Sequence, residues 1–449
     1  MSKILLKKVN TVVTCDDNDR VLHDVDVWFE DGKILSIGSL DAVADEEYDC
    51  SKMLLYPGLI NTHHHLYQYF TRNLSEVQGL ELFDWLTALY QIWKNLNADT
   101  VLYSSLCGMG ELMRYGCTTC MDHHYVFPKN SGDLICAQFE AADALGIRMH
   151  VSRGSMDLSK KDGGLPPDSV VQTVDEIIKD SQRIIEKYND AQPYSMHRVL
   201  LAPCSPFSVS DTLLKESAIL ARQYGVRLHT HLCETQDEQR YTLEKVGLRP
   251  LAYMETLGWL GSDVHYAHGI HFNDEELVLL RDTQTGVCHC PSSNMKLASG
   301  VARIPDMLKM GIPVGLGVDG SASNDASNMI SEIRTAYLLL RLTYADRAPS
   351  GYELLKMATR GSARLIGRDE LGQIKEGFAA DVFLIKKDSM DMVCADRDVK
   401  NIFGTIGYNR PCALVFVNGK CTVRGGILQN VDEDLLARRS QSEVERLLK

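Results

Sequence analysis

The feature that most constrains this chain is a regular alternation of short apolar runs and helix-length amphipathic stretches between residues 53 and 367. A short apolar run has the length of a buried strand, and the stretch after it has the length of a helix that leads to a parallel strand. Eight such runs occur, at residues 54–65, 118–122, 148–152, 199–203, 227–231, 264–268, 286–290 and 313–319. This pattern predicts an α/β fold, a TIM-like (β/α)8 barrel.

The two ends of the chain have a different pattern. Short alternating strands with turns at residues 16–19 and 31–32 occupy the beginning, and β-type alternation returns in ELGQIKEGFAADVFLI and ALVFVNGKCTV. We expect both ends to form one discontinuous β-sandwich domain beside the barrel. The predicted division is a β-sandwich of residues 1–55 and 368–435, a catalytic barrel of residues 56–367, and a C-terminal surface helix of residues 436–449.

Charge and composition restrict the class of partner. A net charge of −13 repels nucleic acid and anionic membranes, which favours a small-molecule partner. The sequence contains no signal peptide and no apolar stretch of about 18 residues, so we expect a cytoplasmic protein without a membrane partner. Its 13 cysteines are an odd number without the spacing of a disulfide framework, and we expect them to be reduced. We also expect a homo-oligomer.

Polar residues gather where the predicted strands end. In a barrel of this type, catalytic groups lie at the C-terminal ends of the strands. The first run ends in NTHHH, and because residues two apart on a strand face the same side, His63 and His65 should point to the barrel axis and His64 away from it. The fifth, sixth and eighth runs end in HTHLCE, YAHG and GLGVDGS, which contribute His231, His268 and Asp319.

This combination of imidazole and carboxylate groups predicts a metal centre. We expect His63, His65, His231 and Asp319 to bind one divalent metal ion. Zn²⁺ is the expected ion, and Fe²⁺ is the alternative. Such an ion lowers the pKa of bound water from ~15.7 to about 7, which provides a nucleophile without a serine or a cysteine.

Proton transfer needs further groups near the metal. Glu234 lies three residues beyond His231 and is predicted to carry protons to the substrate. His268 is predicted to orient or deprotonate the water together with Asp319, so the predicted catalytic residues are Glu234, His268 and Asp319.

Each of these residues also has an ordinary structural explanation, since a single barrel histidine is usually a hydrogen-bonded core residue. Their joint placement at several strand ends favours a functional site. His229 shares a face with His231 one layer deeper, and it is interpreted as a core residue or as a support for a ligand. For His123, His124 and His289, both pocket-lining and structural roles are open.

The segments PGLINTHHH, HTHLCE, AHG, CHCPSSNMKLASG and GLGVDGSASNDASNM resemble, in order and separation, the signatures of the amidohydrolase superfamily. The resemblance extends over essentially the whole chain. It implies a composite β-sandwich with a distorted barrel, and the metal-binding and catalytic roles given above. Members with two metal ions carry a lysine at the end of strand four, where this chain has APCSPF, so the resemblance implies a single ion.

Within the superfamily, the chain is most similar to the aminohydrolase branch, and above all to 8-oxoguanine deaminases, through HHHLYQ, TTCMDHHYVFP, SRGSMDLSKKDGGLPP and LAPCSPFSVS. This resemblance implies zinc-dependent hydrolysis of the amino group of a heterocyclic amine, with 8-oxoguanine converted to urate and ammonia. Gln68 matches the glutamine that guanine deaminases place on the purine, whereas Cys204 replaces their arginine. The expected substrate-binding residues are Gln68, Cys204 and Trp85.

Several alternatives stay open at this point. Isoxanthopterin, guanine, isocytosine and a hydroxylated s-triazine are alternative substrates for the same reaction. A ring-opening amidase is disfavoured by the missing lysine, and the other type of zinc deaminase by the absence of a PCxxC motif. A non-catalytic amidohydrolase-like binding protein is a further alternative, and the presence of all six mechanistic residues argues against it.

Overall fold

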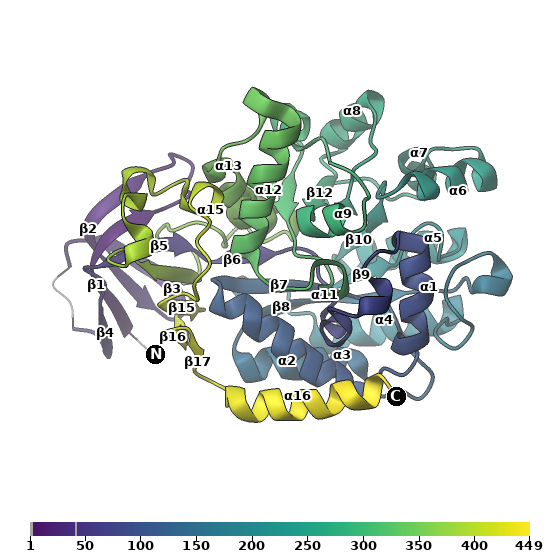
Figure 1. The fold of residues 1–449 in the computed structure, drawn as a ribbon, viewed down its shortest axis with the longest axis horizontal. Coiled ribbons are helices and arrows are strands. Elements are labelled where there is room, and N and C mark those ends of the chain that lie inside the picture. The colour runs from purple at the N-terminus through teal and green to yellow at the C-terminus, as the bar shows by residue number, and fades with distance from the viewer. Residues whose placement is uncertain (1–2, 41–42) are drawn as a thin grey trace.

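The computed structural model describes residues 3–40 and 43–449, and a parallel barrel lies at its centre (Figure 1). Eight strands form this sheet in the order β13-β12-β11-β10-β9-β8-β7-β6. Thr62 N donates to Leu316 O at 3.2 Å and Asp319 N donates to His63 O at 3.0 Å, so the first and last strands meet and the predicted barrel is confirmed. The strands are β6 (Leu59–Asn61), β7 (Cys117–His124), β8 (Arg148–Ser155), β9 (His197–Pro203), β10 (Arg227–Leu232), β11 (Val264–His268), β12 (Gly286–His289) and β13 (Val314–Leu316).

Helices alternate with these strands and surround the barrel. The helix α4 illustrates why: Thr173 and Glu176 form a capping box at its start, and Ile177, Ser181 and Ile184 recur at helical spacing on its buried face. No helix within residues 3–40 and 43–449 has the length and apolar character of a membrane span. The helices are α1 (Leu82–Trp93), α2 (Ala98–Arg114), α3 (Leu134–Leu145), α4 (Val174–Tyr188), α5 (Asp211–Tyr224), α6 (Gln236–Val246), α7 (Pro250–Thr256), α8 (Asp274–Thr283), α9 (Pro291–Lys296), α10 (Ile304–Met310), α11 (Ser321–Asn324), α12 (Met329–Tyr344), α13 (Gly351–Lys356), α14 (Ser362–Leu365), α15 (Ile402–Thr405) and α16 (Glu433–Leu447).

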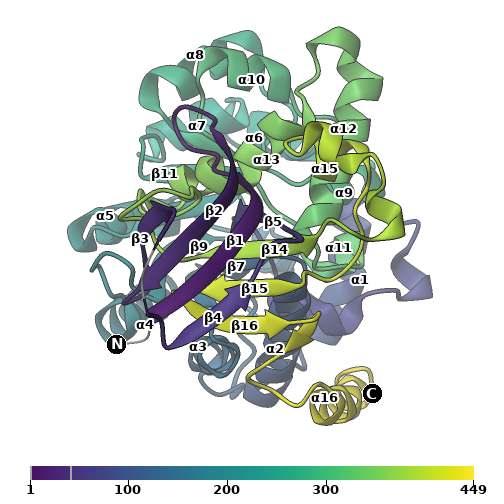
Figure 2. The same cartoon turned by 90° about the vertical axis from the view of Figure 1, so that its left-hand side faces the viewer.

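A second sheet, separate from the barrel, unites the two ends of the chain. It has nine strands, eight of them in the order β17-β16-β15-β14-β5-β1-β2-β3, with β4 paired to β1. Figure 2 shows the purple N-terminal strands beside the yellow C-terminal ones. The rings of Phe29 and Phe416 pack edge to face with their centroids 5.6 Å apart. The sheet therefore encloses its own apolar core, as expected for the β-sandwich. The strands are β1 (Lys3–Val13), β2 (Val21–Glu30), β3 (Lys33–Gly38), β4 (Glu46–Asp49), β5 (Met53–Pro57), β14 (Val382–Lys386), β15 (Leu414–Val417), β16 (Lys420–Arg424) and β17 (Ile427–Leu428).

The first predicted strand, residues 54–65, was wrong in one respect, because it is divided between the two sheets. Its beginning is β5, which pairs with β14 in the terminal sheet, and only β6 belongs to the barrel. Gly58 lies at the division, where its N donates to Asp381 O at 2.8 Å and an added Cβ would lie 2.1 Å from Thr118 Oγ1. This close approach explains a glycine at the joint between the sheets.

The C-terminal helix α16 begins at Glu433, earlier than the start at residue 436 in the predicted division, because Asp432 caps it by accepting from Leu435 N at 2.9 Å. It runs along α2 (Figure 1), where Ser440 Oγ lies 3.1 Å from Cys107 Sγ. The division into residues 1–55 with 368–435, 56–367 and 436–449 stays a prediction.

A buried ion pair ties the barrel to the terminal sheet. Arg148 at the start of β8 is fully buried, and its Nε and Nη2 donate to the two carboxylate oxygens of Asp381 at 3.0 Å each. Arg148 Nη1 also donates to Tyr194 O and Ser195 O at 2.6 and 2.7 Å. Removing one residue of such a fully hydrogen-bonded ion pair is strongly destabilising, because the charge of the other residue stays buried without a partner.

Arg148→Met is therefore expected to destabilise the protein by about 3 to 5 kcal/mol. Chemical denaturation followed by circular dichroism measures the effect. The control is Arg183→Met, which removes a surface arginine paired with Asp133 and Asp180 and should change stability by about 1 kcal/mol or less. Equal shifts in the two variants would contradict the structural role of the Arg148–Asp381 pair.

Candidate metal and catalytic site

The residues predicted as metal ligands meet at the C-terminal end of the barrel. His63 and His65 follow β6, His231 lies on β10, and Asp319 follows β13. Asp319 Oδ1 lies 3.3 Å from the Nε2 atoms of both His63 and His65, and His65 Nε2 lies 3.1 Å from His231 Nε2. His64 points elsewhere, with its Nε2 2.9 Å from Ser327 Oγ, as the strand period predicts.

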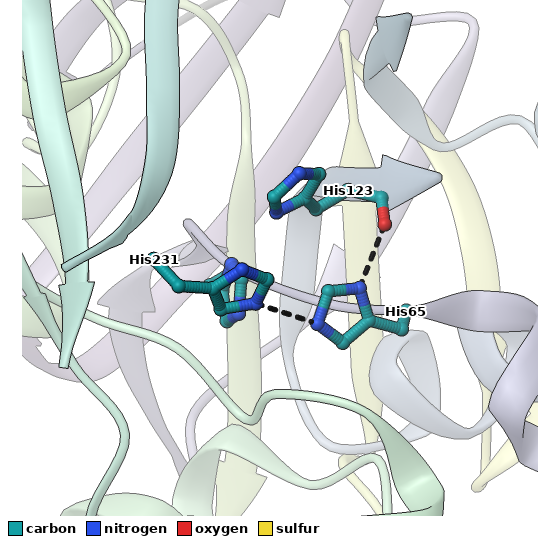
Figure 3. A group of neighbouring side chains, drawn as sticks. His65, His123 and His231 are labelled. Atoms are coloured by element: carbon teal, nitrogen blue, oxygen red, sulfur yellow. Dashed lines mark hydrogen bonds between the residues drawn. The ribbon is translucent and has the colours of Figure 1, made fainter. Parts of the chain in front are cut away.

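Backbone carbonyls determine which ring nitrogen of His65 and His231 carries the proton. His65 Nδ1 lies 2.7 Å from His123 O, and His231 Nδ1 lies 2.5 Å from Cys204 O (Figure 3 shows the first of these contacts). A carbonyl oxygen only accepts, so both Nδ1 atoms donate and both Nε2 atoms hold a lone pair in the neutral rings. Two lone pairs at 3.1 Å repel each other unless a cation lies between them.

The side chain of His229 determines which ring nitrogen of His63 carries the proton. Its Nδ1 lies 3.0 Å from His265 O and must donate, so its Nε2 accepts from His63 Nδ1 at 2.8 Å. His63 Nε2 is left as a buried lone pair without a hydrogen-bond donor among the described residues. The deeper histidine, interpreted from the sequence as a core residue or a support, is thus the hydrogen-bond partner that orients His63.

The convergence of these atoms fits a divalent metal ion. The ring nitrogens of His63, His65, His123 and His231 lie within 4.8 Å of one another, as do ligand atoms of His63, His268 and Asp319. Imidazole nitrogen and carboxylate oxygen are preferred ligands of zinc, and the facing lone pairs require positive charge. His123 Nε2 donates to Ala202 O at 2.8 Å, and its carbonyl orients His65.

The protonation states agree with metal binding. Burial lowers the pKa of His63 to about 4 and lowers that of His231 well below its usual value, so both rings are neutral at pH 7. Burial acts to raise the pKa of Asp319, but hydrogen bonds with His63 and His65 hold it well below the usual range. Asp319 also outweighs the effect of burial on His65 and raises its pKa. Metal binding must displace any proton from His65, which makes metal affinity pH-dependent.

Glu234 and His268 lie beside the ligand cluster. Glu234 Oε2 is 3.5 Å from His268 Nε2, which is 4.0 Å from Asp319 Oδ2. Burial raises the pKa of Glu234, so this carboxyl group holds a proton more readily than an exposed one. Glu238 fixes the turn that carries Glu234, because its carboxylate accepts from Cys233 N and Glu234 N at 3.0 Å each.

Three residues at the same strand ends have strained backbone conformations. Cys233, His268 and Asp319 have φ angles of 54°, 73° and 65°, in the left-handed region that residues other than glycine seldom adopt. Such conformations cost about 1 to 3 kcal/mol each and occur most often at functional sites. Their coincidence with the predicted catalytic residues supports a site here.

A pocket of about 370 Å³ opens over the cluster, and the structure brings all three predicted substrate-binding residues into its wall. Trp85 Nε1 is a buried donor and Gln68 Oε1 a buried acceptor, and neither has a partner among the described residues. Cys204 is buried, and its carbonyl also accepts from Thr230 Oγ1 at 3.1 Å. Unpartnered buried groups in a pocket are suited to a ligand with matching polar atoms.

Other residues of the pocket were missed by the sequence analysis. Tyr125 lies two residues beyond His123, so the strand period could have placed it toward the barrel mouth. Leu82 and Leu86 lie on α1 at helical spacing that does not differ from ordinary core packing. The remaining wall residues that were not predicted are Phe207, Leu297 and Ser323.

The histidines with open roles do not line this pocket. His124 Nε2 lies 2.9 Å from Val126 O, which indicates a structural role. His289 is buried on β12, and within the described chain neither of its ring nitrogens has a hydrogen-bond partner.

Comparison with known proteins agrees with the fold and the site. The Amidohydrolase family model matches residues 54–422. The chain is 45% identical over 423 residues to 8-oxoguanine deaminase of Pseudomonas aeruginosa, covering 93% of this chain and 94% of the relative. It is 36% identical to hydroxydechloroatrazine ethylaminohydrolase of Pseudomonas sp., covering 100% and 96%.

A solved structure extends the comparison to the metal. The atrazine chlorohydrolase TrzN from Arthrobacter aurescens TC1, complexed with zinc, superposes with a TM-score of 0.94 at 32% identity, covering 98% of this chain and 100% of that chain. The zinc in this relative and the buried His and Asp cluster of the present chain support a divalent metal ion, zinc, as cofactor. The matched family model covers most of the sequence, and the chain belongs to the amidohydrolase family.

Proposed function

We propose that this chain is a metal-dependent hydrolytic deaminase of an aromatic nitrogen heterocycle and that its substrate is 8-oxoguanine. The observation that carries the proposal is the approach of Asp319 Oδ1 to the Nε2 atoms of His63 and His65, with His231 Nε2 close to His65 Nε2. The buried carboxyl group of Glu234 lies beside this cluster. The 45% identity to an 8-oxoguanine deaminase supports the choice of substrate. One water is consumed, the C2 amino group leaves as ammonia, and urate is formed.

The bound metal ion supplies positive charge that makes water acidic enough to act as a nucleophile near neutral pH. We assign its binding to His63, His65, His231 and Asp319. The three histidine rings are held in place by hydrogen bonds from their Nδ1 atoms, so little rearrangement is needed when the ion binds.

Proton transfer is assigned to Glu234, His268 and Asp319. Attack on the ring carbon requires a proton on the neighbouring ring nitrogen, and the amino group must be protonated before it leaves. Burial raises the pKa of Glu234, which suits a carboxyl group that both gives and takes protons. We assign to His268 and Asp319, whose Nε2 and Oδ2 atoms lie 4.0 Å apart, the roles of holding the attacking water and receiving its proton.

The pocket wall is suited to a flat ring with polar edges. Leu82, Leu86, Phe207 and Leu297 provide apolar surface, while Gln68 Oε1 and Trp85 Nε1 offer an acceptor and a donor. We assign recognition of the heterocycle edge to Gln68, Trp85 and the Cys204 region.

A second candidate is hydrolysis of an amino substituent on a hydroxylated triazine, supported by the similarity to hydroxydechloroatrazine ethylaminohydrolase. Steady-state ammonia release distinguishes the candidates when 8-oxoguanine, guanine, isocytosine, isoxanthopterin and hydroxytriazines are compared with the zinc-loaded enzyme. We expect the highest kcat/KM with 8-oxoguanine. Preference for another ring would overturn the substrate and leave the deaminase proposal, whereas no ammonia from any of them would overturn both.

Cys204→Arg is expected to shift the preference toward guanine by roughly tenfold to a hundredfold. The reason is that a guanidinium adds a charge-assisted hydrogen bond worth about 1.5 to 3 kcal/mol to a matching acceptor. The measurement is the ratio of kcat/KM for guanine and 8-oxoguanine. Cys204→Ser is the matched control, since it keeps the size without the charge and should leave the ratio unchanged.

Gln68→Ala is the companion variant, and it should weaken all purines together because its carbonyl is assigned to a shared edge. An unchanged ratio in a Cys204→Arg enzyme that retains metal would contradict the role given to position 204.

A further inference from the structure

A second cavity lies at the opposite end of the barrel, at the N-terminal ends of β9, β10 and β11. Its empty volume is about 540 Å³, and none of its wall residues belongs to the active-site pocket. Arg198 and Arg227 contribute positive charge to the wall, and no carboxylate lines it. The apolar part of the wall consists of Met121, Val199, Leu200, Val226 and Ile366.

We propose that this cavity is a binding site for a phosphate oxyanion, held by Arg198, Arg227 and His265. The guanidinium group matches the geometry of a phosphate with paired N–H donors, which makes arginine the usual residue for such ligands. The site is separate from the proposed deaminase chemistry and does not depend on it.

The two arginines have donor capacity left over. Arg198 Nη2 donates to Ala191 O and Gln192 O at 2.9 and 3.0 Å, and Arg227 Nη2 donates to Ser262 O. The Nε atoms of both arginines are buried without a partner, and within residues 3–40 and 43–449 no carboxylate oxygen lies within 4.0 Å of either guanidinium. Both side chains are partly buried, and the nearby carboxylates Asp190, Asp263, Asp369 and Glu370 act on their charge without contacting them. A partly buried guanidinium group without a contacting carboxylate is stabilised by an anion.

Neighbouring arginines are already neutralised and do not compete for the ligand. Arg148 is paired with Asp381, and Arg368 Nε donates to Glu370 Oε1 at 2.7 Å. His150 is another residue of the wall. Its Nε2 lies 3.1 Å from Arg368 Nη1 and is therefore already hydrogen-bonded. The excess positive charge of the cavity therefore belongs to Arg198 and Arg227.

His265 adds a third donor from the inner end of the cavity. Its side chain is 0% exposed, and neither ring nitrogen makes a hydrogen bond of normal geometry within the described residues, although the backbone of Thr62 lies close to the ring. Burial and the nearby Arg227 lower its pKa well below the usual value, so the ring is neutral and presents one N–H. A neutral N–H in the same wall as two guanidinium groups accommodates an oxyanion, and the wall repels a cation.

The test is calorimetric titration of inorganic phosphate into the zinc-loaded protein in chloride buffer. We expect saturable binding that becomes roughly tenfold to a hundredfold weaker in Arg227→Gln and again in the double variant with Arg198→Gln. Arg281→Gln is the matched control, because it removes an exposed arginine paired only with Asp282, and it should bind phosphate like the wild type. Absence of binding, or equal binding by the double variant, would overturn the proposal.

Phosphate could also bind to the metal, so the titration is repeated with His65→Ala. Binding that persists in this variant supports the second cavity, and binding lost with the metal overturns it. Phenyl phosphate is titrated in parallel: tighter binding than inorganic phosphate assigns the apolar wall to the organic part of an ester, and equal binding assigns the cavity to free phosphate.

A measurement without variants guards against misfolding of the arginine mutants. A crystal of the wild-type protein grown with tungstate should show the heavy oxyanion between Arg198 and Arg227. Tungstate found only at the metal site, or nowhere, would contradict the proposal.

Discussion

His65→Ala is expected to abolish turnover and to leave the purified protein with far less than one metal ion per chain, while its circular dichroism spectrum stays that of the wild type. The variant removes the Nε2 atom that lies 3.1 Å from His231 Nε2 and 3.3 Å from Asp319 Oδ1. Loss of one ligand from a centre with few protein ligands removes both metal affinity and the nucleophile that the metal provides.

Elemental analysis and ammonia release measure the two effects together. The control is His197→Ala, which removes a partly exposed imidazole paired with Asp143 and should keep both metal and activity. Full activity in a metal-free His65→Ala protein would disprove the proposed mechanism.

Glu234→Gln is expected to lower kcat by about 10²-fold to 10⁴-fold, the usual contribution of general acid–base catalysis. Glutamine keeps the volume and the acceptor for Ser299 Oγ at 3.5 Å, but it does not exchange protons. Metal content and KM should stay close to the wild-type values, since Glu234 is not assigned as a ligand.

Glu238→Gln separates proton transfer from positioning. Its side chain only orients the turn through Cys233 N and Glu234 N, so the variant should lose less activity than Glu234→Gln. If Glu234→Gln raised KM and left kcat unchanged, Glu234 would be a substrate-binding residue instead.

The barrel was predictable because each strand is an apolar run with its own helix after it, a pattern that local spacing reveals. The division of residues 54–65 was not, because Leu54 and Leu59 are equally buried and equally apolar. Only their partners differ, β14 for one and β7 for the other, and pairing with a distant strand leaves no local trace.

The ligand atoms of the site were predictable from the period of a strand, which places His63 and His65 on one side and His64 on the other. The support that His229 gives to His63 was not, since it depends on how two separate strands are aligned across the barrel. The second cavity was missed for a similar reason. Arg198 and Arg227 lie in the first two residues of their strands, where an arginine is ordinarily exposed, and only the fold brings them into one wall.

The sheet built from both ends of the chain has a consequence for synthesis on the ribosome. β5 can pair with β14 only after almost the whole chain has been made. The same holds for the hydrogen bond from the Tyr56 hydroxyl group to Val399 O, which lies 343 residues further on. At synthesis rates of about 5 to 20 residues per second, this delay is roughly 17 to 70 s. During that time the edge of β5 is open to the strands of other chains. Nascent chains of this protein should therefore depend on chaperones until the last strands emerge.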